Sequence, residues 1–414
     1  MIRQTLYLPL MLLRRAWRRL GVRVAGFALL AGIAALAAPA VEPWMPERLA
    51  SRIGPDAVMP VLTILASSML AVSTFSLNVM VAAHRAAAAN ATPRIHRLLL
   101  EDTTTQSVLA AFIGAFVYSL TTIILFRAKF YGSETAVVVM GVTIFVVAMV
   151  VIAMLRWIEH LSQLGSMDDS MAVAYDRARR SLIARTREPA LGANPLDGNT
   201  VMPERTTPVP ALRSGYVQLA DLGRLQECAG KSASIYITHA PGQHVLRGQP
   251  IAQVGGTVSD ATLDRIAHCF VIGGIRTHEQ DPAFGLTTLS EIASRALSPG
   301  VNDPGTAIEV VTRLGTLLWD YATNDSQPKP PRFSRVFLPV PRDVDMVDAA
   351  FLATARDGAA QIEVARALRR VLLALTEAPA KDLAQAASDM ADRARDHAQL
   401  ALKLESEKDA LDRV

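Results

Sequence analysis

Four windows without a charged residue constrain this chain more than any other feature. They are 18, 27, 24 and 21 residues long and lie at Val24–Val41, Ala57–Ala83, Thr103–Phe126 and Thr135–Leu155. An α-helix needs about 20 mostly apolar residues to cross a bilayer's hydrocarbon core. We therefore expect an α-helical four-span membrane domain, followed by an α+β cytoplasmic domain with a small barrel-sandwich-like β module.

The basic residues predict the orientation of these spans. Residues 1–23 hold six arginines and no acid, whereas the whole chain carries a net charge of +4, so the remainder sums to −2. Positive charge beside a first span favours a cytoplasmic N-terminus. Four crossings then return the C-terminal domain to the cytoplasm of a bacterial inner (plasma) membrane. The same placement argues against nucleic-acid binding.

The second window differs from the others because it has a polar stripe. Thr63, Ser67, Thr74 and Asn78 fall within an arc of about 60° on a helix. Polar side chains in lipid are costly, so the stripe should face protein or water. Two interpretations stay open: interhelical packing within a bundle, or the lining of a pathway in an oligomer. In the third window, Ala111, Gly114 and Ala115 predict close helix contact.

The composition of the chain changes along its length and predicts seven segments. We expect a basic cytoplasmic N-terminus at 1–23, the transmembrane domain at 24–155, and a helical extension continuing from the last span at 156–187. A proline-containing linker (188–213), a small β module (214–258), a helical domain (259–375) and a C-terminal helix (376–414) follow. Within these, residues 259–273 predict one helix and residues 332–340 a strand.

The β module contains a Pro-Gly turn in HAPGQHVLRGQPIAQV (239–254). This stretch resembles the hammerhead turn of biotinyl and lipoyl barrel-sandwich domains. It lacks their exposed modification lysine, because Lys231 lies outside the turn. We therefore predict a packing or ligand-gating module without an attached cofactor.

Charged and amide side chains crowd two Asp-Pro turns that predict helix starts at Asp281-Pro282 and Asp303-Pro304. The candidate pocket comprises Arg276, Asp281, Glu291, Arg295, Asn302, Asp303 and Glu309. One interpretation is capping and ion-pair support for a helical hairpin. The other is a polar pocket for a small ion or ligand, with a cation suiting the acids better than an anion.

The sequence contains few of the motifs that indicate catalysis. The eight histidines include no HExxH, and there is no P-loop, GxSxG or Rossmann fingerprint. Cys228 and Cys269 form no CxxC or metal spacing. We predict no catalytic residues, no metal and no cofactor.

Several longer motifs resemble a bacterial family of predicted membrane proteins, a domain-of-unknown-function family. The match covers roughly residues 20–375, and its most specific part is RTHEQDPAFGLTTLSEIASRALSPGVNDPGTAIEVV at 276–311. It also includes FSL (75–77), TPR (92–94), TQSVLAAFIGAFVYSL (105–120), SGYVQLAD (214–221) and the PG…GQP turn (241–250). The resemblance implies four membrane helices and a cytoplasmic domain, and it carries no activity. Gly305 departs from the bulkier residue usual in the family.

Three hypotheses follow, in descending order of support. The first is a homo-oligomeric, channel-like or transport-related assembly in the lipid bilayer, with a cytoplasmic sensing domain that binds a small ion or ligand. The second is a non-transporting membrane scaffold or signalling protein. The third is a membrane-tethered enzyme that uses Arg276, Asp281, Asn302 and Asp303.

Overall fold

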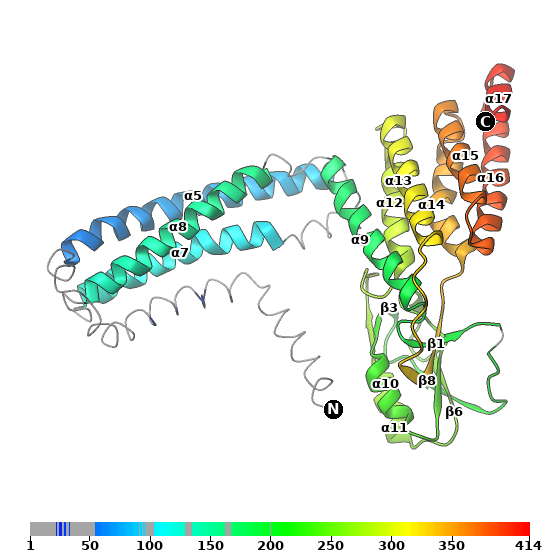
Figure 1. The fold of residues 1–414 in the computed structure, drawn as a ribbon, viewed down its shortest axis with the longest axis horizontal. Helices are drawn as coiled ribbons and strands as arrows, with labels where there is room; N and C mark the ends of the chain where they lie inside the picture. The colour runs from blue at the N-terminus through cyan, green and yellow to red at the C-terminus, as the bar shows by residue number, and fades with distance from the viewer. Residues whose placement is uncertain are drawn as a thin grey trace. The chain divides into compact units, whose positions relative to one another are not determined.

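The computed structural model describes residues 54–90, 92, 94, 95, 103–128, 135–161, 167–198 and 200–414, together with five residues between 22 and 33. The chain divides into two units. One comprises residues 1–90 and 96–169, and the other comprises residues 91–95 and 170–414. We call them the membrane unit and the C-terminal unit, and Figure 1 labels their elements.

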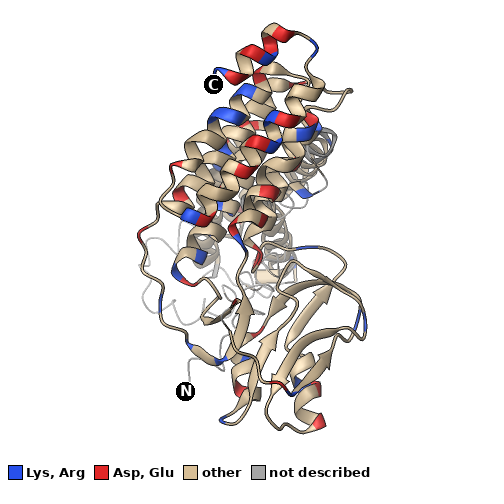
Figure 2. Ribbon diagram, turned by 90° about the vertical axis from the view of Figure 1, so that its right-hand side faces the viewer, with Lys and Arg blue, Asp and Glu red and all other residues tan. Residues whose placement is uncertain are grey.

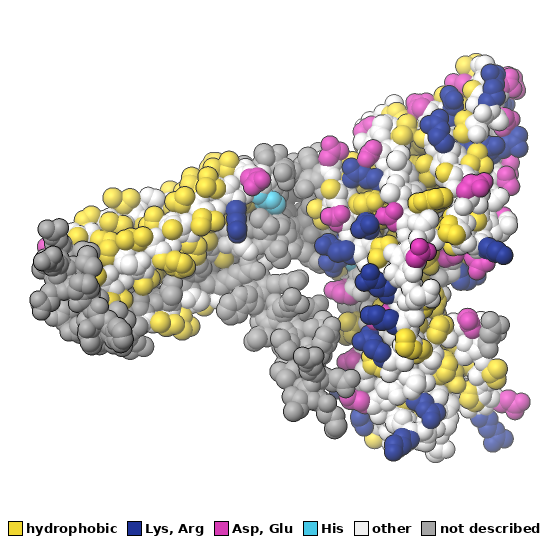
Figure 3. All heavy atoms as spheres, in the orientation of Figure 1, with side chains coloured by type: hydrophobic (Ala, Val, Ile, Leu, Met, Phe, Trp, Pro, Cys, Tyr) yellow, Lys and Arg dark blue, Asp and Glu magenta, His cyan; other side chains and the backbone are white. Residues whose placement is uncertain are grey.

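The membrane unit contains three long helices in its described part. They are α5 (Pro55–Asn90), α7 (Thr103–Arg127) and α8 (Thr135–Leu161). Each includes a stretch that is long and apolar enough to span a membrane, at Pro55–Ala82, Gln106–Arg127 and Ala136–His160. Their surface is covered by hydrophobic side chains (Figure 3). The first predicted span, 24–41, lies largely outside the described residues, so the count of four is not confirmed.

Small residues bring α7 close to its neighbours. Ala111, Gly114 and Ala115 are all buried, as their spacing predicts. Tyr118 of α7 makes two polar contacts with α8, because its hydroxyl lies 3.1 Å from that of Thr143 and donates to the Val139 carbonyl at 3.4 Å. Such a contact between membrane helices contributes about 0.6 kcal/mol on average. Packing of small and apolar side chains therefore holds this unit together.

The C-terminal unit begins within α9 (Met167–Arg187). The expected helical extension at 156–187 includes the end of α8 and all of α9, and residues 162–166 between them lie outside the described residues. Eight strands follow: β1 (Ala193–Leu196), β2 (Thr206–Pro210), β3 (Gly215–Ala220), β4 (Ser234–Ile237), β5 (His244–Val245), β6 (Pro250–Gly255), β7 (Phe270–Gly273) and β8 (Phe333–Pro339).

These strands form a five-stranded sheet in the order β1-β8-β4-β6-β2 and a three-stranded sheet in the order β5-β3-β7. The larger sheet is mixed, because β8 runs parallel to both β1 and β4 while β6 is antiparallel to β4 and β2. The predicted strand at 332–340 is confirmed as β8. The barrel-sandwich arrangement is not confirmed, and the expected linker supplies β1 and β2.

One core lies beneath both sheets. It includes Val217 and Ile272 from the smaller sheet and Ile235, Ile251 and Val336 from the larger one. Two short helices, α10 (Leu222–Ala229) and α11 (Asp260–Ala267), add apolar side chains to this core. The predicted single helix at 259–273 is wrong in its second half, because residues from Phe270 pair with β3 as strand β7.

The remaining chain forms helices that lie side by side in Figure 1. They are α12 (Pro282–Ala296), α13 (Pro304–Ala322), α14 (Asp343–Asp357), α15 (Ile362–Thr376), α16 (Lys381–Ala401) and α17 (Glu405–Asp412). On α15, Val364, Leu368, Leu372 and Leu375 form a buried stripe at helical spacing, and each contributes about 2 kcal/mol through burial. Acidic and basic residues are interspersed along these helices (Figure 2).

The C-terminal segment is packed rather than solvated. Helix α16 buries Leu383, Ala387 and Met390, and the chain then turns into α17 instead of continuing as one helix. Leu411 of α17 is 1% exposed within a small cluster that includes Ala365 and Ala398. An ion pair of 2.8 Å between Arg395 and Asp412 holds the two helices together at the surface.

Replacement by alanine should have opposite effects on stability at two glycines of the 276–311 motif. A Cβ on Gly285 of α12 would lie 2.6 Å from the Ala178 Cβ of α9, whereas a Cβ on Gly305 would meet only the Asp303 carboxylate, at 3.3 Å. We expect Gly285→Ala to destabilise the protein by about 1–3 kcal/mol through overpacking. Gly305→Ala should stabilise it by about 0.4–1 kcal/mol.

Thermal unfolding of both purified variants in detergent would measure these effects. An unfolding temperature for Gly285→Ala at or above that of the unsubstituted protein would show that α9 and α12 do not meet as described.

Candidate functional site

The seven residues of the expected pocket separate into groups at the two ends of α12. Asp281 directly precedes this helix, and Asn302 and Asp303 follow its C-terminal end. The helix has 15 residues, so it is about 22 Å long. Arg276 lies with Asp281, Arg295 is in the last turn of α12, and Glu309 is in α13. The structure therefore does not bring the seven together in one pocket.

The group after α12 has a capping role. Asp303 accepts hydrogen bonds from the backbone N–H and hydroxyl of Thr306, at 3.0 and 2.6 Å, which lower the pKa of its carboxyl group. Asn302 has a left-handed φ of 49° and accepts a hydrogen bond from Gln361. Glu309 pairs with Arg313 one turn along α13. These contacts confirm the predicted cap and support the helical hairpin.

The group before α12 is buried. Asp281 is 4% exposed and accepts hydrogen bonds from Nε and Nη2 of Arg276, at 2.9 and 2.6 Å. Its other oxygen accepts from the backbone N–H of Phe284, which confirms the predicted cap. Burial raises the pKa of Asp281, while Arg276 opposes that shift. Removal of Arg276 would thus leave a buried carboxylate without its counter-charge.

The segment around Asp281 also fastens strand β3. The side-chain amide of Gln280 exchanges two hydrogen bonds with the backbone of Ala220, at 2.9 and 3.1 Å. Gln218 donates from its side chain to the Ile275 carbonyl. The Pro-Gly turn lies against the same place, because a Cβ on Gly242 would overlap the Asp281 carboxylate. Three motifs far apart in sequence therefore meet at Asp281.

A short segment between α5 and α7 joins this arrangement. Residues 91–95 belong to the C-terminal unit, and Thr92 and Ile95 are buried in it. Arg94 forms an ion pair with Glu291 of α12. The Arg94 guanidinium also lies 5.6 Å from the centre of the Phe284 ring, and Arg276 lies 4.9 Å from the same ring. We call Arg94, Arg276, Phe284 and Glu291 the clasp.

His278 borders the clasp as a neutral side chain. Its ring lies 4.4 Å from that of Phe284. Burial, followed by the positive charge of Arg177, lowers the pKa of His278 to about 4. The imidazole is therefore uncharged near neutral pH, which avoids a third positive group beside Arg94 and Arg276.

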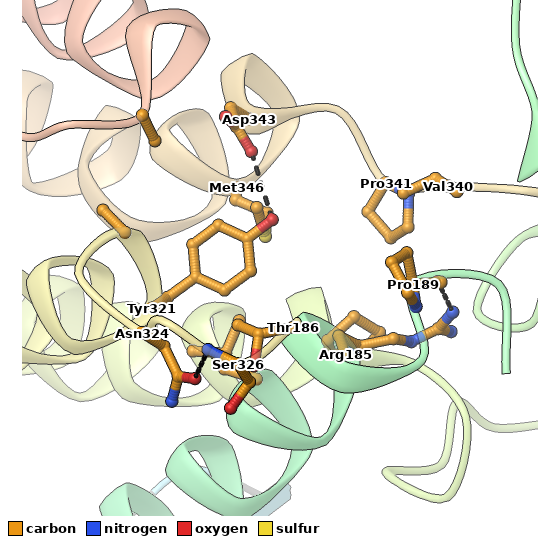
Figure 4. Close-up of a pocket in the computed structure, with 14 residues that line it drawn as sticks. Arg185, Thr186, Pro189, Tyr321, Asn324, Ser326, Val340, Pro341, Asp343 and Met346 are labelled. Atoms are coloured by element: carbon orange, nitrogen blue, oxygen red, sulfur yellow. Dashed lines mark hydrogen bonds between the residues drawn. The ribbon is translucent and has the colours of Figure 1, made fainter. Parts of the chain in front are cut away.

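A cavity of about 230 Å³ borders the start of α12, where Pro282 is one of its lining residues. Arg185 of α9 borders it and donates hydrogen bonds of 2.6 Å to the carbonyls of Pro189 and Gln280. Figure 4 shows Arg185 and Pro189 on one side and Tyr321 with Asp343 on the other. Sequence reasoning missed Arg185, Tyr321 and Asp343, because they belong to separate helices and form no local motif.

The two cysteines also meet, although sequence placed them in unrelated contexts. Cys228 of α10 and Cys269 before β7 border one surface hollow, and both thiols are free. Burial raises the pKa of Cys269 to about 12, so it is not a reactive thiolate. Among the residues described, no group of three or more His, Cys, Asp or Glu is arranged to hold a metal.

The polar stripe of α5 faces away from the other described membrane helices. Thr63, Ser67, Thr74 and Asn78 are exposed, whereas Ser73 and Ser76 are the buried hydroxyl residues. The hydroxyls of Thr63, Ser67 and Thr74 donate to carbonyls of their own helix. The stripe therefore does not form hydrogen bonds to α7 or α8, which sets aside packing against these two helices.

The apolar helices of the membrane unit and the charged C-terminal unit together define an integral membrane protein. Residues 15–374 match the family described as Predicted membrane protein (DUF2254), and the chain belongs to this family. The resemblance inferred from the motifs is thus confirmed.

Curated relatives from Mycobacterium bovis and Mycobacterium tuberculosis, both named as uncharacterized proteins, are 27% identical over 269 residues. The aligned region covers 62% of this chain and 51% of each relative, so the chain spans about half the length of these proteins. No solved structure matches the chain.

Alanine substitutions at two glycines of the β module would test whether the Pro-Gly turn packs against Asp281. Gly242 and Gly248 have φ values of +94° and +86°, but only Gly242 lies against the carboxylate, while Gly248 has open space around it. Alanine at either position should cost about 1–2 kcal/mol for the left-handed backbone. Gly242→Ala should cost about 1–3 kcal/mol more, because it displaces a buried hydrogen-bonded acid.

Thermal unfolding of the two variants would measure the difference, and Gly248→Ala controls for the backbone term. Equal unfolding temperatures would contradict the packing of the turn on Asp281.

Proposed function

We propose that this protein is a homo-oligomeric, channel-like or transport-related assembly of the bacterial inner membrane. In this proposal the N-terminus and the C-terminal unit lie in the cytoplasm, and the C-terminal unit senses a small ligand. The observation that carries the proposal is the clasp. It binds the segment between two membrane helices to the unit that would receive the signal.

The clasp provides a physical route between the two units. Helix α5 ends at Asn90 and α7 begins at Thr103, and residues 91–95 between them belong to the C-terminal unit. Any displacement of α12 acts on Arg94 through Glu291 and Phe284. Because Arg94 lies between α5 and α7 along the chain, we propose that such a displacement is passed to these helices.

The clasp also supports the expected topology. Residues 91–95 and 170–414 form one unit, which supports a topology in which residues 91–95 lie on the same side of the membrane as the rest of the C-terminal unit. That side is expected to be the cytoplasm because of the six arginines in residues 1–23.

The exposed stripe of α5 supports a pathway between copies of the chain. Polar side chains that face away from α7 and α8 must meet lipid, another part of the protein or water, and lipid is the costly choice. The intrahelical bonds of Thr63, Ser67 and Thr74 favour a second candidate, a non-transporting scaffold or signalling protein. In that case the stripe would contribute only to assembly.

An enzyme is the third candidate and has the least support. Asp281 and Asp303 lie at opposite ends of α12, and both are engaged in helix capping. The group proposed for catalysis, Arg276, Asp281, Asn302 and Asp303, is therefore divided between two places.

Planar-bilayer recordings of the purified protein in K⁺, Na⁺ and Cl⁻ solutions would test the channel hypothesis. We expect a measurable conductance that falls by roughly tenfold when Thr63, Ser67, Thr74 and Asn78 are replaced together by Ala, equivalent to about 1.4 kcal/mol in the barrier. The matched control is Ser73→Ala with Ser76→Ala, because these hydroxyls are buried in the same helix. An absence of conductance would favour the scaffold, whereas a conductance that the fourfold substitution leaves unchanged would show that the stripe does not line the pathway.

Substitutions in the clasp would test the coupling. Arg94→Gln and Glu291→Gln should each increase hydrogen exchange at residues 92–95, and the double variant should add little. The expected interaction free energy is about 0.5–1 kcal/mol, since the pair is partly exposed.

Arg342→Gln is the control, because it breaks an ion pair on the surface of α14. Fully additive effects of Arg94→Gln and Glu291→Gln would contradict the clasp.

A further inference from the structure

The cavity beside Arg185 has groups of opposite charge at its two ends. Arg185 lies at one end, and the carboxylate of Asp343 and the hydroxyl of Tyr321 lie at the other (Figure 4). Leucine, proline and methionine side chains form much of the wall between them, at Leu182, Pro282, Pro341 and Met346. The cavity is thus polar at its ends and apolar along its walls.

Arg185 is a buried cation that contacts neutral groups. It is 8% exposed, and it donates hydrogen bonds to two backbone carbonyls. A guanidinium has further N–H donors beyond these two. The Asp281 carboxylate, which contributes to the electrostatic environment of Arg185, is engaged by Arg276. A buried charge without a counter-charge in contact is costly, so an anionic group beside Arg185 would be stabilising.

The opposite end of the cavity has a negative character. Tyr321 donates a hydrogen bond of 3.5 Å to Asp343, and burial followed by the charge of Asp382 raises the pKa of Asp343. A second anion would be repelled there by Asp343 and Asp382, whereas an ammonium group would relieve that repulsion.

The size of the cavity limits the ligand. Its volume of about 230 Å³ is below the roughly 300–1,000 Å³ of sites for drug-sized molecules. A single small molecule with one anionic end, one cationic end and an apolar body fits these constraints.

We propose that this cavity binds a small zwitterion of the ω-amino-acid class, in which an apolar chain separates the two charges, with its carboxylate at Arg185 and its ammonium group at Asp343 and Tyr321. This deepens the proposed function, since it rests on the C-terminal unit being the sensing part and names the ligand class. The location suits that role. Arg185 bonds the Gln280 carbonyl and Pro282 borders the cavity, so the ligand contacts the segment that carries Asp281 and Phe284.

Binding to the full-length protein in lipid nanodiscs tests the proposal directly. The probes are 4-aminobutanoate, 5-aminopentanoate and 6-aminohexanoate, with 5-aminopentanoate compared against pentanoate, which lacks its amine, and butylamine, which lacks its carboxylate. Inorganic phosphate is a further comparison. We expect at least one of these ω-amino acids to raise the unfolding temperature and to give a saturable heat of binding. Each half-ligand should bind about tenfold or more weakly than 5-aminopentanoate itself, because one charge-assisted contact is lost.

Two pairs of variants assign the contacts. Asp343→Asn should weaken amino-acid binding by about tenfold or more, whereas Asp345→Asn, on an exposed acid in the same helical turn, should not. Arg185→Gln should abolish binding, and Arg180→Gln on the exposed surface of α9 is its control. Because Arg185 also holds two carbonyls, the Asp343 pair keeps the test valid if Arg185→Gln does not fold.

The possible results separate this proposal from the channel hypothesis. Binding with the expected variant pattern supports the zwitterion site whether or not the protein conducts ions. No binding of any of these ω-amino acids overturns it. Phosphate or pentanoate binding as tightly as 5-aminopentanoate, or an Asp343→Asn variant that binds normally, also overturns it in favour of a simple anion site.

Discussion

The buried carboxylate of Asp281 is the interaction on which the C-terminal unit depends. It caps α12, accepts two hydrogen bonds from Arg276 and lies against the Pro-Gly turn at Gly242. Burial of an acid is costly unless its hydrogen bonds and charge are satisfied. The strands, the turn and the helices must therefore all be in place before this carboxylate is stable. That requirement explains why three separated motifs converge on one side chain.

From Asp281 the structure extends in two directions. Phe284 and Arg276 meet Arg94, whose neighbours in the chain lead to α5 and α7. Gln280 and Pro282 meet Arg185 and the cavity. The same short segment thus borders a cavity and contacts Arg94 from the segment between α5 and α7. In the proposed function, a ligand that binds one position of this segment more tightly than another would act on Arg94.

Local features of the candidate site could be predicted, and long-range ones could not. The caps at Asp281 and Asp303 follow from an Asp-Pro pair, because the side chain satisfies nearby N–H groups and proline suits the first helical turn. Nothing local indicates that Arg94, 190 residues before Phe284, lies over its ring. The same holds for Arg185, Tyr321 and Asp343. The helix predicted at 259–273 failed at Phe270 because pairing with β3 outweighs local preference.

By itself, the sequence determined the membrane character of the chain, its family, the apolar windows of three described helices and the first residues of α12 and α13. Each of these depends on contiguous residues, through hydrophobic length or hydrogen bonds within one turn. Only the tertiary structure decided which residues of the 276–311 motif meet, that the expected linker supplies two strands, and that the stripe of α5 faces away from α7 and α8. These outcomes depend on burial and pairing between distant segments, and a side chain's partners across the fold are not encoded in its neighbours along the chain.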